Sequence, residues 1–121
     1  GKKAASVTKQ LGLEGCFIGS TDLTHYGPNY GFSPRGIGGD SLTWMKEVND
    51  KRVIDLFLAL DPEGVMKEAS VSKNACCPGA AAAAISAVKE MGVEKGSLVE
   101  YATSYDVHPD TSFVGYAGVV Y

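Results

Sequence analysis

The sequence predicts an α/β fold in which a partial mixed sheet is flanked by helices. Three observations lead to this prediction. An apolar run at residues 15–20 is typical of a short strand buried on both faces. Residues 41–91 carry several helical patterns separated by turn signals. Two β-rich segments, 97–104 and 113–121, end the chain and could pair as an antiparallel hairpin.

The first third of the chain is predicted to form a helix, a strand and a long loop. The helix covers residues 2–11 and ends at Gly12, a residue that tolerates the backbone conformation of a helix C-cap. The strand at 15–20 is expected to bury Cys16 in the core. Residues 21–40 are rich in glycine and proline, so they are expected to form an irregular loop, and loops of this length are often functional.

Four helices are predicted for the middle of the chain, each from a cap or proline signal at its start. Asp40 or Ser41 caps the first, which runs to about residue 48. Asn49 or Asp50 caps the second, which is expected to bury one apolar face made of Val53, Ile54, Phe57 and Leu58. The third and fourth are expected at 62–69 and 79–91, after the Asp61-Pro62 pair and after Pro78.

The length of 121 residues indicates one domain. Three strands are few for a free-standing sheet that several helices cover. We therefore expect additional strands to come from a missing N-terminal half or from a partner chain, and association of identical chains is a further option. The chain begins with Gly and not Met, which suggests a trimmed protein or a piece of a longer one.

Charge and cysteine content exclude several classes of function. The net charge is −3, the isoelectric point is about 5.3, and no basic stripe is present, so nucleic acid is not an expected partner. No apolar run reaches the roughly 20 residues that span a bilayer, and no signal peptide pattern is present. Three cysteines cannot close a disulfide framework, which favours free thiols and a cytoplasmic location.

The strongest candidate site follows the predicted strand at 15–20. Asp22 and His25 lie three positions apart where the apolar run gives way to small and polar residues. In open α/β sheets, ligands bind beyond the carboxyl ends of strands. His25 is therefore a candidate general base or proton carrier, and Asp22 its orienting partner. The alternative is local turn chemistry, in which each side chain only bonds the nearby backbone.

Cys76 is the second candidate, because it lies just before the helix predicted to start after Pro78. Free N–H groups and the helix dipole favour a thiolate there, which could ligate a metal or act as a nucleophile. The alternative is a small buried apolar residue, the usual fate of a free cysteine. Cys77 is expected to serve packing.

Further candidates are expected to line the same cleft. Ser104 and Asp106 end a predicted strand, although turn chemistry explains them equally well. Tyr26, Tyr30 and Phe32 flank His25 and either form a wall for a small, possibly aromatic, ligand or pin the loop down. No nucleotide fingerprint and no recognised metal-binding spacing is present.

Four segments together resemble one family. Residues 20–27 (STDLTHYG) resemble the S-S-D-L-S-H-Y-G motif of Memo-like proteins, known in microbes as AmmeMemoRadiSam system protein B. Residues 74–79 (NACCPG) resemble the family's A-C-G-P-G motif, with Cys77 in place of its Gly. Residues 101–106 (YATSYD) and 113–117 (FVGYA) resemble its Y-x-T-S-x-D and V-G-Y-A ending.

The resemblance implies a relation to the class III extradiol dioxygenases, which use a non-haem Fe(II). His25 matches the histidine that acts as acid and base, and Asp22 matches a pocket aspartate. Cys76 matches the position where the dioxygenases place a carboxylate ligand and Memo has a cysteine. The remaining metal ligands of these families are histidines from the N-terminal half, so residues 1–121 resemble the C-terminal portion of a single Memo-like domain.

Two functions are compatible with these residues. The first is a dioxygenase-type pocket in which Fe(II), Cu or Zn in the full-length protein assists redox or oxygen chemistry on a small molecule. His25 and Asp22 would be catalytic, Cys76 a metal ligand, and Tyr26, Ser104 and Asp106 substrate contacts. This chain alone is expected to bind no metal tightly, because open catalytic sites usually need three protein ligands. The second is a non-catalytic binding or signalling module that keeps the pocket as a relic.

Overall fold

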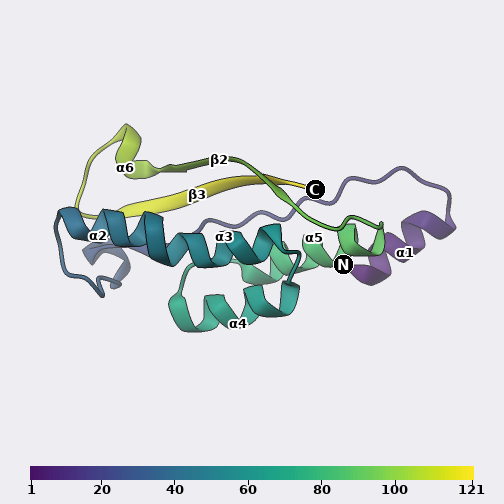
Figure 1. Cartoon of the computed structure of the whole chain (residues 1–121), viewed down its shortest axis with the longest axis horizontal. Helices are drawn as coiled ribbons and strands as arrows, with labels where there is room; N and C mark the ends of the chain where they lie inside the picture. Colours follow the sequence, from purple (N-terminus) through teal and green to yellow (C-terminus); the bar gives the residue numbers. More distant parts are fainter.

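The computed structural model describes residues 1–121 and confirms the α/β class. A three-stranded sheet lies along one side of the molecule, and helices α3, α4 and α5 lie on the other (Figure 1). The strand order is β1-β3-β2, and both pairings are antiparallel. The strands are β1 (His25–Tyr26), β2 (Ser97–Thr103) and β3 (Phe113–Val120). The predicted hairpin of the last two strands is present.

The helices match most of the predicted positions. Their bounds are α1 Lys2–Gln10, α2 Gly39–Trp44, α3 Lys51–Leu58, α4 Pro62–Ser72, α5 Pro78–Glu90 and α6 Ser104–Val107. A 3-10 turn, η1, covers Pro28–Tyr30, and a π-helical turn, η2, covers Met45–Asp50. No helix combines the length and the apolar character needed to cross a bilayer.

The helix break predicted at Asn49 or Asp50 is wrong. Helix α2, the turn η2 and helix α3 follow one another without an interruption from Gly39 to Leu58. Asn49 and Asp50 are inside this run and fully buried, and neither side chain caps a helix. These two residue types favour helix starts because their side chains bond nearby backbone, but here they bond other segments instead.

The strand predicted at residues 15–20 is also wrong. The segment is extended, but none of its backbone groups makes a hydrogen bond, and its apolar side chains are not buried as predicted. Ile18 is 87% exposed, and Cys16 is exposed and not in the core. A strand needs a neighbour to pair with, and no other strand of this chain reaches this segment. The first residues that bond β3 come later, at Leu23 and Thr24 and then in β1, inside the region predicted as loop.

One contact holds the extended segment against helix α5. A Cβ atom on Gly19 would lie 2.7 Å from the Ala80 carbonyl oxygen and 3.0 Å from the Ala84 Cβ. The chain can therefore approach the helix this closely only because position 19 carries no side chain and the facing helix positions are alanines. The alanine-rich helix predicted from the sequence thus has this segment as one of its neighbours.

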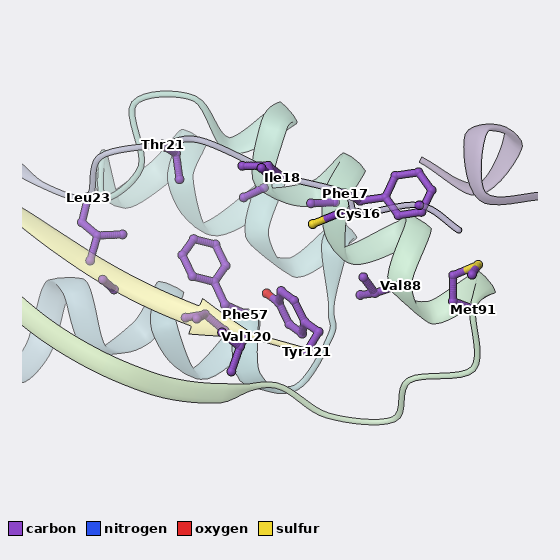
Figure 2. Close-up of a pocket in the computed structure, with 16 residues that line it drawn as sticks. Cys16, Phe17, Ile18, Thr21, Leu23, Phe57, Val88, Met91, Val120 and Tyr121 are labelled. Carbon is purple, nitrogen blue, oxygen red and sulfur yellow. The ribbon is translucent and has the colours of Figure 1, made fainter. Parts of the chain in front are cut away.

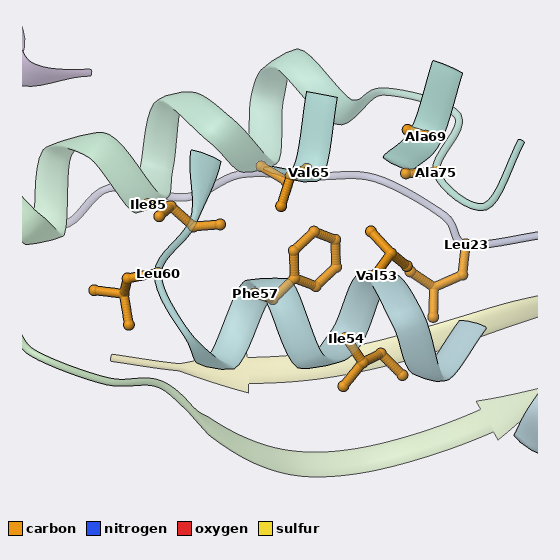
Figure 3. Packing of buried hydrophobic residues seen from close by; sticks show 10 residues of the cluster. Leu23, Val53, Ile54, Phe57, Leu60, Val65, Ala69, Ala75 and Ile85 are labelled. Atoms are coloured by element: carbon orange, nitrogen blue, oxygen red, sulfur yellow. The ribbon is translucent and has the colours of Figure 1, made fainter. Parts of the chain in front are cut away.

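The main apolar core lies between α3, α4 and α5. Figure 3 shows Phe57 pointing from α3 toward Val65 of α4, while Ile54 of the same helix points toward the strands. Its members are Leu23, Val53, Ile54, Phe57, Leu60, Val65, Ala69, Ala75, Ala81 and Ile85. Leu23 belongs to this core, so the chain is anchored immediately before His25.

Candidate functional site

Strand β3 fixes the position of His25. The Leu23 N–H donates to the Gly115 carbonyl at 2.9 Å, and the Gly115 N–H donates to the Thr24 carbonyl at 3.0 Å. His25 then pairs with Val114. Pairing with β3 therefore begins at Leu23, and His25 lies two residues into the paired stretch. The segment is therefore rigidly placed by backbone bonds from a strand far along the sequence.

Asp22 and His25 face each other. The distance from His25 Nε2 to Asp22 Oδ2 is 3.5 Å, and the two side chains are 31% and 48% exposed. The Tyr30 ring meets the imidazole edge-on, with ring centroids 4.9 Å apart. A half-exposed pair of this kind adds little to stability but can orient the imidazole. The pairing of these two residues inferred from their spacing is present in the structure.

Cys76 lies against the same aspartate. The Asp22 N–H donates to Cys76 Sγ at 3.3 Å, and the Cys76 N–H donates to the Asp22 carbonyl at 3.1 Å. The Cys77 N–H also donates to Thr21 Oγ1 at 2.9 Å. Asp22 thus contacts both His25 and Cys76, although more than fifty residues separate the two site segments.

Neither Cys76 nor Cys77 is buried, although the sequence offers burial as the alternative for Cys76 and predicts packing for Cys77. Cys76 and Cys77 are both exposed thiols, so Cys76 is not a buried apolar residue and Cys77 does not serve core packing. The backbone N–H groups of both residues are bound to residues 21 and 22, and the Cys76 sulfur lies against the same two residues while the side chain stays exposed. The Cys76 thiol is therefore accessible to a ligand from outside the chain.

The residues of this chain do not by themselves fit a metal ion. No group of three or more His, Cys, Asp and Glu side chains lies close enough together to hold one. Cys76, Asp22 and His25 are neighbours, but their donor atoms do not converge on a common point in such a group. Open catalytic metal sites usually have three protein ligands, so any metal here would need donors from another segment.

The predicted substrate contacts lie apart from His25. Tyr26 is fully buried on the opposite face of β1, stacked on Phe113 with ring centroids 5.1 Å apart, and its hydroxyl donates to the Gly36 carbonyl at 2.8 Å. Ser104 Oγ accepts the Val114 N–H at 3.0 Å, on the side of β3 away from β1. In this structure, the side chains of Tyr26 and Ser104 are engaged in packing and hydrogen bonding within the fold.

Asp106, the third predicted contact, stabilises a helix start and an ion pair. Its carboxylate accepts from the Thr103 N–H and hydroxyl, both at 2.7 Å, and it lies 2.8 Å from Lys46 Nζ. The hydrogen bond from Lys46, followed by those from Thr103, lowers the pKa of Asp106 to about 2. The side chain is therefore an anion at neutral pH, with these two residues as its partners.

A buried polar network lies beneath the site and was not predicted from the sequence. Asp50 accepts hydrogen bonds from the Thr24 N–H, the Thr24 hydroxyl and the Tyr101 hydroxyl. Burial raises the pKa of Asp50, and these bonds counteract only part of that effect. Burial and the facing Asp50 carboxylate likewise raise the pKa of Tyr101 far above its ordinary value. No sequence signal marks this pair, because Asn49 and Asp50 lie in a run that also carries Lys46, Glu47, Lys51 and Arg52.

A large cavity lies beside the site and not at it. It measures about 550 Å³ and separates the extended segment at 15–20 from the end of β3. Figure 2 shows Phe57 and Tyr121 lying between these two segments. Thr21 and Leu23 line the cavity, but Asp22 and His25 do not, and the rest of the wall is mostly apolar. The cavity is thus space between two segments that do not pair.

Comparison with known proteins gives one consistent family. Residues 1–120 match the family model described as Memo-like protein. A MEMO1 family protein of Pyrococcus furiosus is 34% identical over 122 residues, covering 99% of this chain and 42% of the relative. Relatives from Methanopyrus kandleri and Methanothermobacter thermautotrophicus are 35% and 36% identical, and each is covered over 38% of its length. The chain therefore spans about two-fifths of the length of the curated relatives that it matches.

Proposed function

This chain belongs to the Memo-like protein family, and from that premise we propose that it supplies the acid–base part of a dioxygenase-type site for a small molecule. One observation carries the proposal: Asp22 contacts His25 through its side chain and Cys76 through its backbone. A base, an orienting carboxylate and an accessible thiol are thus brought together on one exposed surface. We propose redox or oxygen chemistry in the full-length protein as the reaction class.

The roles of the residues follow from their chemistry. The imidazole of His25 is placed to act as a proton acceptor or donor, and the Asp22 carboxylate at 3.5 Å favours one orientation of the ring. The exposed edge of the ring is free to face a bound molecule, because the side chain is about one-third exposed. Tyr30 closes one side of this surface by its edge contact with His25.

A metal at Cys76 remains part of the proposal only for the full-length protein, since this chain brings no third donor. Fe(II), Cu and Zn are the candidates, and a thiolate ligand favours Cu or Zn over Fe(II). The missing ligands would come from the part of the relatives' length that this chain does not cover. Three free cysteines fit a reducing compartment, so we propose a cytoplasmic location.

Completion of the sheet is the second part of the proposal. The segment at 15–20 is apolar, extended and without a single backbone hydrogen bond, and helix α5 holds it in place. Such an edge accepts a further strand by backbone pairing. We propose that this strand comes from the remainder of the full-length protein or from a partner chain. Its arrival would bury Ile18 and bring further residues near Asp22.

A non-catalytic binding module is the alternative, and one observation favours it. Neither described cavity is lined by Asp22, His25 or Cys76, so the three residues lie on an open surface in this chain. An open surface is better suited to recognition of a partner than to excluding water from a reaction.

Metal content and oxygen consumption of the full-length protein would separate the two functions. We expect Cys76→Ala to lose bound metal and activity together, and His25→Ala to keep the metal but lose activity, because only the thiol is a proposed ligand. His108→Ala is the matched control, since this exposed histidine lies in the loop after α6. Unchanged metal content and oxygen consumption in both site variants, with loss of partner binding, would establish the binding module instead.

A further inference from the structure

The turn η2 places two buried polar residues next to each other beneath the candidate site. Asn49 is 1% exposed and Asp50 is 0% exposed. The turn is π-helical, a wide turn that is rare and is frequent at functional sites. Neither residue touches the exposed surface that carries His25, so any influence on that surface must pass through other residues.

Asp50 holds the segment that leads into His25. Its Oδ1 accepts the Thr24 N–H at 3.0 Å and also the Thr24 hydroxyl, and its Oδ2 accepts the Tyr101 hydroxyl at 2.8 Å. Position 115 must be glycine for this arrangement, because a Cβ atom there would overlap Asp50 Oδ2. The carboxylate is therefore fully occupied, and two of its three bonds fix the residue directly before His25.

Asn49 connects Thr24, the residue before His25, to the segment that carries Cys76. Its Nδ2 donates to Thr24 Oγ1 at 2.9 Å and to the Ser72 carbonyl at 3.1 Å. Its own carbonyl accepts from Asn74 Nδ2 at 2.8 Å. Asn74 is fully buried and lies two residues before Cys76. One side of the pair thus faces the His25 segment, and the other faces the Cys76 segment.

We propose that Asn49 and Asp50 are positioning residues that hold the His25 segment and the Cys76 segment in one fixed arrangement. The catalytic importance of this arrangement rests on the proposed function. The connection between the two segments through Asn49 and Asp50 is a property of the fold alone. The two residues are covalent neighbours, so a displacement of Thr24 displaces the group that holds Asn74. Asn74 Oδ1 is buried without a hydrogen-bond partner, so the bond from Asn74 Nδ2 to the Asn49 carbonyl is one of the few that fix this side chain. Hydrogen bonds linked in this way in a buried network can contribute more together than each does alone.

A purely structural role gives a different expectation. If the network only adds stability, its loss lowers the free energy of unfolding but leaves the local environment of Cys76 unchanged in the folded molecules. If the pair positions the two segments, loss of the Thr24 bonds also loosens the contacts of Asp22 with the Cys76 sulfur. The reactivity of the Cys76 thiol in the folded protein therefore separates the two roles.

The experiment measures the alkylation rate of Cys76 by iodoacetamide in a Cys16→Ser, Cys77→Ser background at fixed pH. Asp50→Ala and the isosteric Thr24→Val should each raise this rate about fivefold to tenfold, the factor expected for the loss of one buried hydrogen bond. Asp50→Asn keeps an acceptor for the Thr24 N–H and should restore a rate close to that of the parent protein. Asp55→Ala, which removes an exposed partner of Lys51 on the same helix, is the matched control and should have no effect.

Circular dichroism and the unfolding midpoint are recorded for each variant, so that only folded protein is compared. Asp50→Ala leaves donors unpaired and is the variant most exposed to unfolding, which is why Thr24→Val decides the result. A rate within about twofold of the parent in folded Thr24→Val would overturn the proposal. No metal, substrate or activity enters this measurement, so its failure is distinct from failure of the proposed function.

Discussion

Gly115 illustrates how a single residue permits the site to form. It lies on β3 opposite Leu23 and Thr24, and it faces the buried Asp50 carboxylate. Its backbone pairs with the segment that leads into His25, while its missing side chain leaves room for Asp50 Oδ2. A charged group that is buried this fully is stable only if its donors remain in place. Gly115 is therefore required both for the pairing of β3 with residues 23 and 24 and for the hydrogen bonds of Asp50 below the sheet.

Gly115→Ala should lower the free energy of unfolding by about 1–3 kcal/mol or more, because the added methyl group would displace the Asp50 carboxylate. Gly79→Ala is the matched control. Gly79 has no atom within 4 Å of its Cβ position, so the same chemical change in the first turn of α5 should be neutral or slightly stabilising. Urea unfolding of both variants checks this, and equal effects would contradict the assigned role of Gly115.

The motifs indicated which residues lie together better than they indicated what holds those residues in place. Asp22, His25 and Cys76 follow from the order of residue types along the chain, and the structure places them side by side. The sequence predicts a helix cap at Asn49 or Asp50, because a sequence pattern records only local preferences. Their actual partners, Thr24 and Asn74, lie about 25 residues away in either direction. Contacts of that separation carry no periodic signal.

At the scale of elements, helix α6 shows how a short element can depend on one side chain. It has only four residues, and its N-cap is Thr103, whose backbone N–H and hydroxyl both donate to Asp106. A four-residue helix has no independent stability, so this reciprocal cap and the ion pair with Lys46 hold it in place. The turn between β2 and β3 is therefore sensitive to the charge of Asp106.

Asp106→Asn should destabilise the protein by about 1 kcal/mol at neutral pH, since half-exposed caps and ion pairs contribute on this scale. The pKa of Asp106 is lowered to about 2 from 3.8, so its contribution is complete above pH 3.8 and is lost as the pH falls toward 2. The difference between the parent and the variant should shrink over that interval. Urea unfolding across this range measures it, with Glu94→Gln as an exposed control; a constant difference would refute the assignment.

The elements that were predicted wrongly share one physical cause. The run at 15–20 has the composition of a buried strand, yet a strand exists only if another strand donates and accepts its hydrogen bonds. The residue composition of 15–20 can be read from the segment itself, whereas its hydrogen-bonded pairing depends on which other strand lies beside it in the folded molecule. The sheet order β1-β3-β2 likewise depends on β3 reaching back to residues near the start of the chain, which no local pattern encodes.

At the scale of the whole molecule, the sheet has an open side. Ile18 is 87% exposed in the extended segment, and Val99 is 63% exposed in β2. Exposed apolar edges of this kind promote pairing with other chains. The chain spans only about two-fifths of its curated relatives, and the open segment is consistent with the proposal that further strands complete the sheet.

This chain should self-associate as its concentration rises, and Ile18→Lys should weaken that association by at least about tenfold, because a charge on an open edge opposes pairing. The stability of the monomer should change by less than about 0.5 kcal/mol, since the residue is exposed. Val107→Lys is the control, because Val107 is 89% exposed but lies in α6, away from any open strand. Sedimentation equilibrium measures both, and equal association of the two variants would show that the segment is not the contact.

The central place of β3 has a consequence for the order of events during synthesis. Both β1 and β2 are made before the strand that lies between them, and neither pairs with the other. Until residues 113–120 leave the ribosome, His25 therefore has no strand to dock on, although the helices that follow it can already collapse around Phe57. The helical layer can mature before β3 is made, whereas the surface that carries the imidazole takes shape only after it.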